Sequence, residues 1–193
     1  LCIDLIGPYK FGTGKHEAKL HALTMIDPAT GWFEIVKIDR KRADLIINHL
    51  EHTWLTRYPW PTEITMDKGS EFAREVSAAI KNEYGITKKV ITTRNPQANA
   101  IIERVHQVVH QMVRSSNIKD ARDLDKDAPW QGVLSAVRQA MRSLVHTTLR
   151  ATPTQLVFGR AALLNDSFDE LSEFFIRSES KSDDLPYSQF SRK

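Results

Sequence analysis

The spacing of apolar residues changes repeatedly along this chain, and these changes restrict its fold more than any other feature. Short apolar runs with the two-residue period of a strand alternate with longer segments in which apolar side chains recur every three or four residues, as in a helix. The predicted strands span residues 1–9, 21–26, 32–38, 63–66 and 89–93, and the predicted helices span residues 43–58, 70–84, 99–116, 130–149 and 153–158. This order predicts an α/β domain with a mixed five-stranded sheet flanked by helices.

Turn-forming residues mark the boundaries of these elements. Gly7-Pro8 is expected to end the first strand in a turn, before a polar loop at residues 10–19. The segment Asp-Pro-Ala-Thr-Gly at residues 27–31 predicts a hairpin, in which Asp27 serves the turn, and Gly85 predicts the end of a helix. The four tryptophans are expected to pack in the core or at helix starts: Trp32, Trp54, Trp60 and Trp130.

Charge divides the 193 residues into two parts. Residues 165–193 hold seven acids and four bases, which leaves 23 bases and 17 acids, a net charge of +6, in residues 1–164. We expect residues 1–164 to form the domain and residues 165–193 to be an acidic, flexible tail. A moderately basic domain suits nucleic acid as a partner. No apolar run approaches the roughly 18 residues of a membrane span, so we expect no membrane partner.

Three carboxylates in separate elements are the candidate chemistry. Asp4 lies in the first strand on the same face as Cys2 and Ile6, Asp67 follows a short strand, and Glu103 lies in the helix at 99–116. Each has an ordinary reading as a solvated or turn residue. Carboxylates brought together repel one another unless cations intervene, and Mg²⁺ prefers such oxygen ligands. Two metal ions about 4 Å apart can hold the attacking and leaving oxygens of a phosphoryl displacement.

Three segments carry a family resemblance. Cys2 to Pro8, Met66 to Phe72 and Asn95 to Arg104 resemble the signature blocks of the retroviral and retrotransposon integrase catalytic core, and 35 residues separate Asp67 from Glu103, as in that family. A fourth segment, Thr152 to Arg160, is similar to the segment that follows the core in gypsy-like long-terminal-repeat retrotransposons. The resemblance covers about residues 1–160 and does not extend to the tail.

The resemblance implies an RNase H-like fold and an enzyme, a DNA integrase or polynucleotidyl transferase with endonuclease activity. It implies that Asp4, Asp67 and Glu103 are catalytic and bind two Mg²⁺ ions, for which Mn²⁺ can substitute. The enzyme would trim the 3′ ends of retroelement DNA and join them to target DNA. Double-stranded DNA and further copies of the chain, as a dimer or higher homo-oligomer, are the implied partners. The implied location is the host nucleus, or a retroelement particle in the cytoplasm.

Several positions depart from the family pattern. Ala100 stands where the family usually has Gly, and Lys68 stands where it often has Asn. Gln107 and His110 stand where the family often has lysines that bind DNA. The candidate DNA contacts lie after the second Asp, in the loop before the helix at 99–116, and on the polar side of that helix. They are Lys68, Arg94, Gln97, Asn99, Arg104, Gln107 and His110.

Alternative functions follow from these departures and from other patterns. A catalytically decayed or host-adopted copy would keep the fold as a DNA- or protein-binding module. A ribonuclease H would require a fourth carboxylate, for which Glu51 is the candidate. Glu103 and His106 share one side of the helix in a Glu-x-x-His pattern typical of di-iron proteins, but the chain lacks the second copy that such a site needs. Gly12 to Lys15 does not meet the spacing of a phosphate-binding loop.

Overall fold

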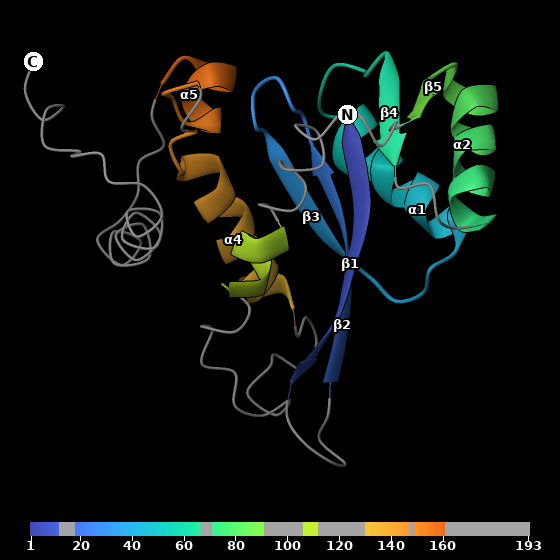
Figure 1. Ribbon diagram of the computed structural model, residues 1–193, viewed down its shortest axis with the longest axis horizontal. Coiled ribbons are helices and arrows are strands. Elements are labelled where there is room, and N and C mark those ends of the chain that lie inside the picture. Colours follow the sequence, from blue (N-terminus) through green and yellow to red (C-terminus); the bar gives the residue numbers. More distant parts are fainter. Residues whose placement is uncertain (12–17, 67–70, 91–105, 112–129, 147–148, 161–193) are drawn as a thin grey trace, which may run out of the picture.

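Five strands form a mixed sheet in the computed structural model (Figure 1). The structure describes residues 1–11, 18–66, 71–90, 106–111, 130–146 and 149–160. The strands are β1 (Cys2–Phe11), β2 (Ala18–Ile26), β3 (Phe33–Ile38), β4 (Glu63–Met66) and β5 (Thr87–Val90), in the spatial order β3-β2-β1-β4-β5. β1, β2 and β3 pair antiparallel, whereas β4 pairs parallel with both β1 and β5. The predicted mixed five-stranded sheet is confirmed.

β1 is longer than predicted. The strand was predicted over residues 1–9, with a turn at Gly7-Pro8 as its end. Pairing with β2 instead resumes at Tyr9 and continues to Phe11, after a register shift between Ile6 and Tyr9. The irregularity accommodates Pro8, which has no N–H to donate to the ladder. Gly7 is required there because its φ is +97° and a Cβ would lie 2.3 Å from the carbonyl oxygen of Leu20. The predicted loop at 10–19 was therefore too long at both ends.

The hairpin between β2 and β3 is confirmed. The Asp27 N–H donates to the carbonyl of Trp32 at 2.9 Å, and the Gly31 N–H donates to the carbonyl of Asp27 at 2.8 Å. The Asp27 carboxylate accepts from the Ala29 N–H at 3.1 Å and from the Thr30 hydroxyl at 2.6 Å. Asp27 thus has the turn role that its sequence context predicted.

One face of the sheet is covered by α1 (Ala43–Leu50), the π-helix η2 (Glu51–Leu55) and α2 (Glu71–Tyr84). The helix predicted at 43–58 is confirmed to Leu55, with its last part wound as a π-helix. Gly85, at φ +67°, ends α2 as predicted, and its N–H donates to the carbonyl of Lys81 at 3.0 Å. A first core cluster lies between these helices and the sheet: Ile3, Leu23, Met25, Trp32, Ile38, Ile46, Leu50, Trp54, Leu55, Ile64, Met66, Val76, Ile80 and Ile86.

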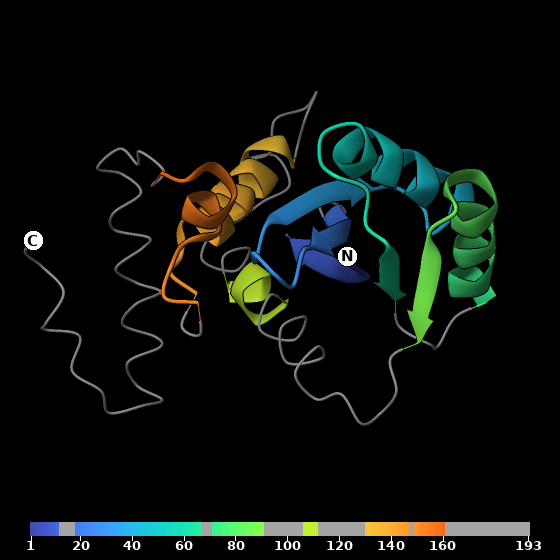
Figure 2. The same ribbon diagram turned by 90° about the horizontal axis from the view of Figure 1, so that it is seen from above.

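The opposite face is covered by the helical residues 106–111 and by α4 (Gln131–Ser143), beyond which lies α5 (Pro153–Phe158) (Figures 1 and 2). The second core cluster fills this side and contains Cys2, Ile6, Leu20, Ala22, Ile26, Phe33, Ile35, Val109, Trp130, Leu134, Val137 and Ala140. The helix predicted at 99–116 is confirmed over residues 106–111, and the rest of it lies outside the described residues. No helix in the described part of the chain is long and apolar enough to span a membrane.

Three further expectations need correction. α4 ends six residues before the predicted Leu149, because Leu144 is extended and the Arg142 carbonyl accepts the Thr154 hydroxyl at 2.8 Å. β5 begins two residues before the predicted position 89. Trp60 is 56% exposed rather than buried, although its indole N–H donates to the Leu55 carbonyl at 2.9 Å. The predicted tail at 165–193 lies outside the described residues.

Candidate active site

Asp4 lies in the middle sheet strand, β1, within the part that pairs with β2. Its partner in the register is Thr24, whose hydroxyl donates to the Asp4 carbonyl at 3.1 Å. The flanking same-face residues, Cys2 and Ile6, belong to the second core cluster, as the strand alternation predicted. The Asp4 side chain is 27% exposed, so it stands at the margin of that core with access to water. Its Oδ1 accepts the Leu5 N–H at 2.7 Å.

The second oxygen of Asp4 faces a histidine. Nε2 of His106 lies 3.1 Å from Oδ2 of Asp4, and the His106 side chain is 29% exposed. His106 is held there by its own helical segment, since Val109 in the next turn is fully buried in the second core cluster. From the sequence, His106 was expected on the polar side of its helix, and its di-iron pattern was rejected. Nothing in the sequence showed that it would meet Asp4, because the two residues are 102 positions apart.

β4 brings a second signature segment next to Asp4's strand. It runs parallel to β1, with Cys2 opposite Thr65 and the Thr65 N–H donating to the Leu1 carbonyl at 2.8 Å. Its last residue, Met66, is buried in the first core cluster. Asp67 follows Met66 in the chain. The carboxyl ends of parallel strands are the edge at which α/β folds place ligands.

Most of the predicted site residues lie outside the described parts of the chain. These are Asp67, Glu103, Lys68, Arg94, Gln97, Asn99 and Arg104. Of the two candidate DNA contacts that are described, Gln107 is exposed. His110 is exposed and stacks on Tyr9 of β1, with ring centroids 5.7 Å apart and an interplanar angle of 28°. His110 therefore already has a protein contact on one face of its ring.

Asp4 suits a divalent cation in chemistry and exposure. Carboxylate oxygens are the ligands that Mg²⁺ and Mn²⁺ prefer, and Oδ2 is the oxygen that the Leu5 N–H leaves free. Within the described residues no group of three or more His, Cys, Asp or Glu side chains could hold a metal ion. The other two predicted ligands, Asp67 and Glu103, lie outside the described residues.

The fourth carboxylate required of a ribonuclease H is not supplied near Asp4 by Glu51. Glu51 lies in η2, on the sheet face opposite to Asp4. It interacts with Tyr84, whose pKa is raised chiefly by burial and then by the Glu51 charge and hydrogen bond. Glu51 therefore belongs to the packing between η2 and α2.

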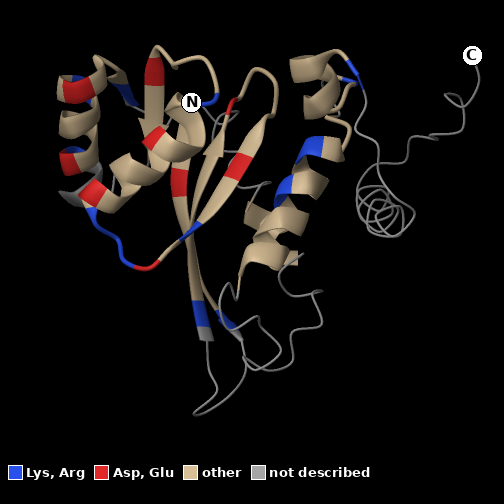
Figure 3. Ribbon diagram, turned by 180° about the vertical axis from the view of Figure 1, so that it is seen from behind, with Lys and Arg blue, Asp and Glu red and all other residues tan. Residues whose placement is uncertain are grey.

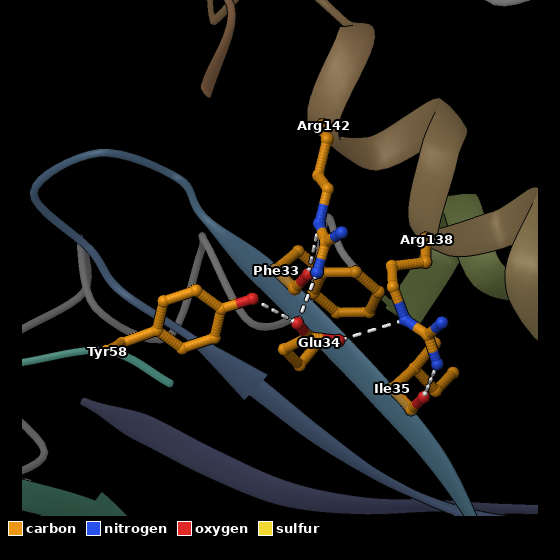
Figure 4. A network of polar contacts seen from close by, with 6 residues as sticks. All are labelled: Phe33, Glu34, Ile35, Tyr58, Arg138 and Arg142. Carbon is orange, nitrogen blue, oxygen red and sulfur yellow. Dashed lines mark hydrogen bonds and ion pairs between the residues drawn. The ribbon is translucent and has the colours of Figure 1, made fainter. Parts of the chain in front are cut away.

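A second cluster of charges, which the sequence analysis missed, fixes α4 to the edge strand β3 (Figures 3 and 4). The Glu34 side chain is 1% exposed and forms ion pairs with both arginines of α4: Arg138, with Nε 2.9 Å from Oε2, and Arg142. Its Oε1 also accepts the Tyr58 hydroxyl at 2.6 Å. The periodic pattern of the sequence gave no signal for this cluster, because a charged residue in a strand is usually solvated.

The two arginines also satisfy the open edge of the sheet. Arg138 donates to the Ile35 carbonyl at 2.8 Å, and Arg142 donates to the Phe33 carbonyl at 3.0 Å. These carbonyls lie on the side of β3 that has no strand partner. The Arg142 guanidinium also lies 4.1 Å from the Trp32 ring centroid, a cation–π contact. Burial lowers the pKa of Arg142. Burial, followed by the Glu34 hydrogen bond, raises the pKa of Tyr58.

The fold is similar to that of solved retroviral integrase catalytic cores. A mixed sheet in the order β3-β2-β1-β4-β5 with helices on both faces is the RNase H-like arrangement found in retroviral integrase catalytic cores. The chain is similar to the catalytic core of bovine immunodeficiency virus (BIV) integrase, with a TM-score of 0.57 and 17% identity over 90% of this chain and 97% of that one. It is also similar to the magnesium complex of the HTLV-2 integrase catalytic core, with a TM-score of 0.52 and 15% identity over 80% of this chain and 93% of that one.

Sequence comparison gives a family resemblance as well. Residues 1–96 match the family model described as Integrase core domain. The Pol polyprotein of the Drosophila melanogaster transposon 412 is 26% identical over 88% of this chain, and the Pro-Pol polyprotein of feline foamy virus is 26% identical over 81%. The chain is thus similar to the integrase core domain family over residues 1–96. It spans only 13% and 12% of the lengths of those two relatives.

Proposed function

We propose that this chain is the catalytic core of a retroelement integrase, which trims the 3′ ends of element DNA and joins them to target DNA. The match of residues 1–96 to the integrase core domain model supports a polynucleotidyl transferase. The proposal adds that Asp4, Asp67 and Glu103 bind two Mg²⁺ ions. These ions would supply a polarised phosphate and an activated oxygen nucleophile for in-line displacement.

The observation that carries the proposal is the contact between Asp4 and His106. It joins the strand of the first signature segment to the helical residues that follow the third one. Glu103 precedes His106 by three residues, so its Cα lies within about 11 Å of the His106 Cα in any chain conformation. This limit is compatible with Glu103 as a second ligand of a cation bound at Asp4.

The pairing of β1 with β4 supports the place of Asp67. Cys2 lies opposite Thr65 in a parallel register, and adding two residues to each gives positions 4 and 67. Asp67 is bonded to Met66, so their Cα atoms are about 3.8 Å apart. This register supports the proposal that the three carboxylates lie together beside β1.

The residues of this chain would each have a defined task in the reaction. The three carboxylates would hold the ions, and the loop before the helix, with Arg94, Gln97 and Asn99, would contact the DNA end. Phosphate contacts from such polar and basic side chains position DNA without reading its sequence. A water molecule would be the nucleophile for trimming, and the freed 3′-hydroxyl would be the nucleophile for joining. We further propose action on double-stranded DNA by a homo-oligomer, in the nucleus or in a retroelement particle.

The test offers the 193-residue chain a branched DNA that mimics the joined product, with Mn²⁺ or Mg²⁺. We expect the wild type to resolve the branch and both Asp67→Asn and Glu103→Gln to lose at least about a thousandfold in rate, the scale on which loss of transition-state charge stabilisation acts. Asp39→Asn is the matched control, because its carboxylate is exposed and paired with Lys37 at 2.8 Å. Equal product from wild type and Asp67→Asn would contradict the proposal and favour a binding module.

A further inference from the structure

The geometry around Asp4 points to a ligand beyond the three carboxylates. We propose that His106, through Nε2, is a direct ligand of the cation that Asp4 binds. This inference rests on the proposed function, because it assumes a cation at Asp4. It gives the site one nitrogen donor in addition to its oxygens.

The first argument is the separation of the two donors. Nε2 of His106 and Oδ2 of Asp4 lie 3.1 Å apart. Adjacent ligands of an octahedral ion bound at about 2.1 Å are about 3.0 Å apart, since the edge of an octahedron is √2 times its radius. The two atoms therefore already have the spacing of neighbouring ligands on one ion.

The second argument is that Nε2 of His106 has no hydrogen-bond partner among the described residues. The atom is shielded from solvent, and it lies 3.1 Å from Oδ2 of Asp4 without a hydrogen bond to it. A buried nitrogen without a partner costs free energy that a hydrogen bond or a metal ion would recover. An imidazole lone pair directed at a shared cation removes this cost.

The third argument is that the ring is held in place. Val109, one turn along the helix, is fully buried in the core cluster that also contains Cys2 and Ile6, the neighbours of Asp4 on its strand face. His110 adds a stacking contact with Tyr9 of the same strand. Both contacts fix the helical segment against β1, so His106 and Asp4 approach each other without a rearrangement of the backbone.

A nitrogen ligand changes which ion the site prefers. Imidazole binds the later, softer divalent ions better than it binds Mg²⁺, which favours oxygen donors. We therefore expect the chain to bind Mn²⁺ more tightly than Mg²⁺. Replacement of His106 by glutamine, which supplies only an amide, should weaken Mn²⁺ binding about tenfold and Mg²⁺ binding by a smaller factor.

The experiment measures the ligands of bound Mn²⁺ by pulsed electron paramagnetic resonance, on the 193-residue chain labelled with ¹⁵N in its histidine rings. We expect a ¹⁵N coupling typical of a directly bound imidazole. His106→Gln should abolish this coupling. His110→Gln, four residues further along the same helix, is the matched control and should retain it.

Two variants separate the failure of this inference from that of the proposed function. Asp4→Asn should abolish Mn²⁺ binding. If Asp4→Asn lowers Mn²⁺ affinity but the wild type shows no ¹⁵N coupling, His106 is not a ligand and the carboxylate site stands. If His106→Gln keeps the coupling, the inference is equally overturned. If Asp4→Asn leaves Mn²⁺ binding unchanged, the cation site itself is wrong and both proposals fall.

Discussion

Replacing Glu34 by glutamine tests whether its charge holds α4 against the sheet. The Glu34 side chain is 1% exposed, and its carboxylate meets Arg138, Arg142 and the Tyr58 hydroxyl. Glutamine has the same size and keeps one acceptor oxygen, but it carries no charge and places an amide group where one arginine now finds an oxygen. Glu34→Gln therefore removes the charge while it preserves the packing volume.

The size of the effect follows from the burial of the two arginines. Their side chains are 27% exposed at Arg138 and 17% exposed at Arg142. Removing one partner of a buried ion pair costs about 3–5 kcal/mol, because the remaining charge is left without compensation. The acceptor that glutamine keeps restores about 1 kcal/mol, and Arg142 retains its bond to the Phe33 carbonyl. We expect Glu34→Gln to lower the free energy of unfolding by about 3 kcal/mol.

Urea unfolding at 25 °C measures this loss. With a urea dependence of about 2 kcal/mol/M, the midpoint should fall by about 1.5 M while the slope stays unchanged. Asp39→Asn is the matched control, a carboxylate-to-amide change in an ion pair with Lys37 in which Asp39 is 78% exposed. Exposed pairs contribute at most about 1 kcal/mol. An equal loss in the two variants would refute the reasoning.

A double-mutant cycle assigns the loss to the pair itself. Arg142→Met should destabilise the wild type by more than it destabilises Glu34→Gln, because in the second background the charge that it removes is already unpaired. A coupling free energy of about 2 kcal/mol is expected for a charge-assisted contact at this depth. Additive losses would mean that the two side chains act on stability separately.

Three smaller predictions concern other described residues. Gly7→Ala should lower the free energy of unfolding by more than about 2 kcal/mol, because the new Cβ would lie 2.3 Å from the Leu20 carbonyl oxygen. Gly85→Ala, at φ +67° with open space around it, should lower it by about 1 kcal/mol. Thermal unfolding compares the two variants, and equal losses would contradict the clash at Gly7. Burial, and then the Glu34 hydrogen bond, raise the pKa of Tyr58. The contribution of Tyr58 to stability is therefore complete below pH 10 and is lost as the pH rises towards the folded-state pKa. The melting temperature should fall more between pH 9 and 11 in the wild type than in Tyr58→Phe. Burial raises the pKa of the Cys2 thiol. The thiol should therefore react with an aromatic disulfide at least about tenfold more slowly in the native chain than in urea. Equal rates would show that β1 opens readily.

Local signals predicted the parts of the fold that local interactions decide. The hairpin at residues 27–31 was predictable because Asp27 makes its hydrogen bonds within five residues of itself. β4 was predicted at its observed bounds, since its sequence is preceded by Pro59 and Pro61 and followed by the turn-forming residues Asp67 and Gly69. The continuation of β1 beyond Gly7-Pro8 was not predictable, because it depends on the approach of the Leu20 carbonyl from the neighbouring strand.

The polar contacts of the described structure depend on residues far apart in the chain. Glu34 and Arg142 are separated by 108 positions, and no periodicity of either segment specifies that they meet. The same holds for Asp4 and His106. The family resemblance identified Asp4 through its motif, but its physical surroundings, one oxygen bound by the Leu5 N–H and the other facing an imidazole, required the tertiary structure.

The Glu34 ion pairs and the contact between Asp4 and His106 both border the second core cluster, and this links the stability of α4 to the candidate active site. The Glu34 contacts hold α4 against β3, and α4 buries Leu134 and Val137 in the same core cluster that contains Val109. Val109 in turn fixes the helical turn that carries His106. Interiors packed at this density transmit displacements from one side chain to the next. Residues of β3 and α4 that do not contact the proposed cation site would thus help to set the distance between His106 and Asp4.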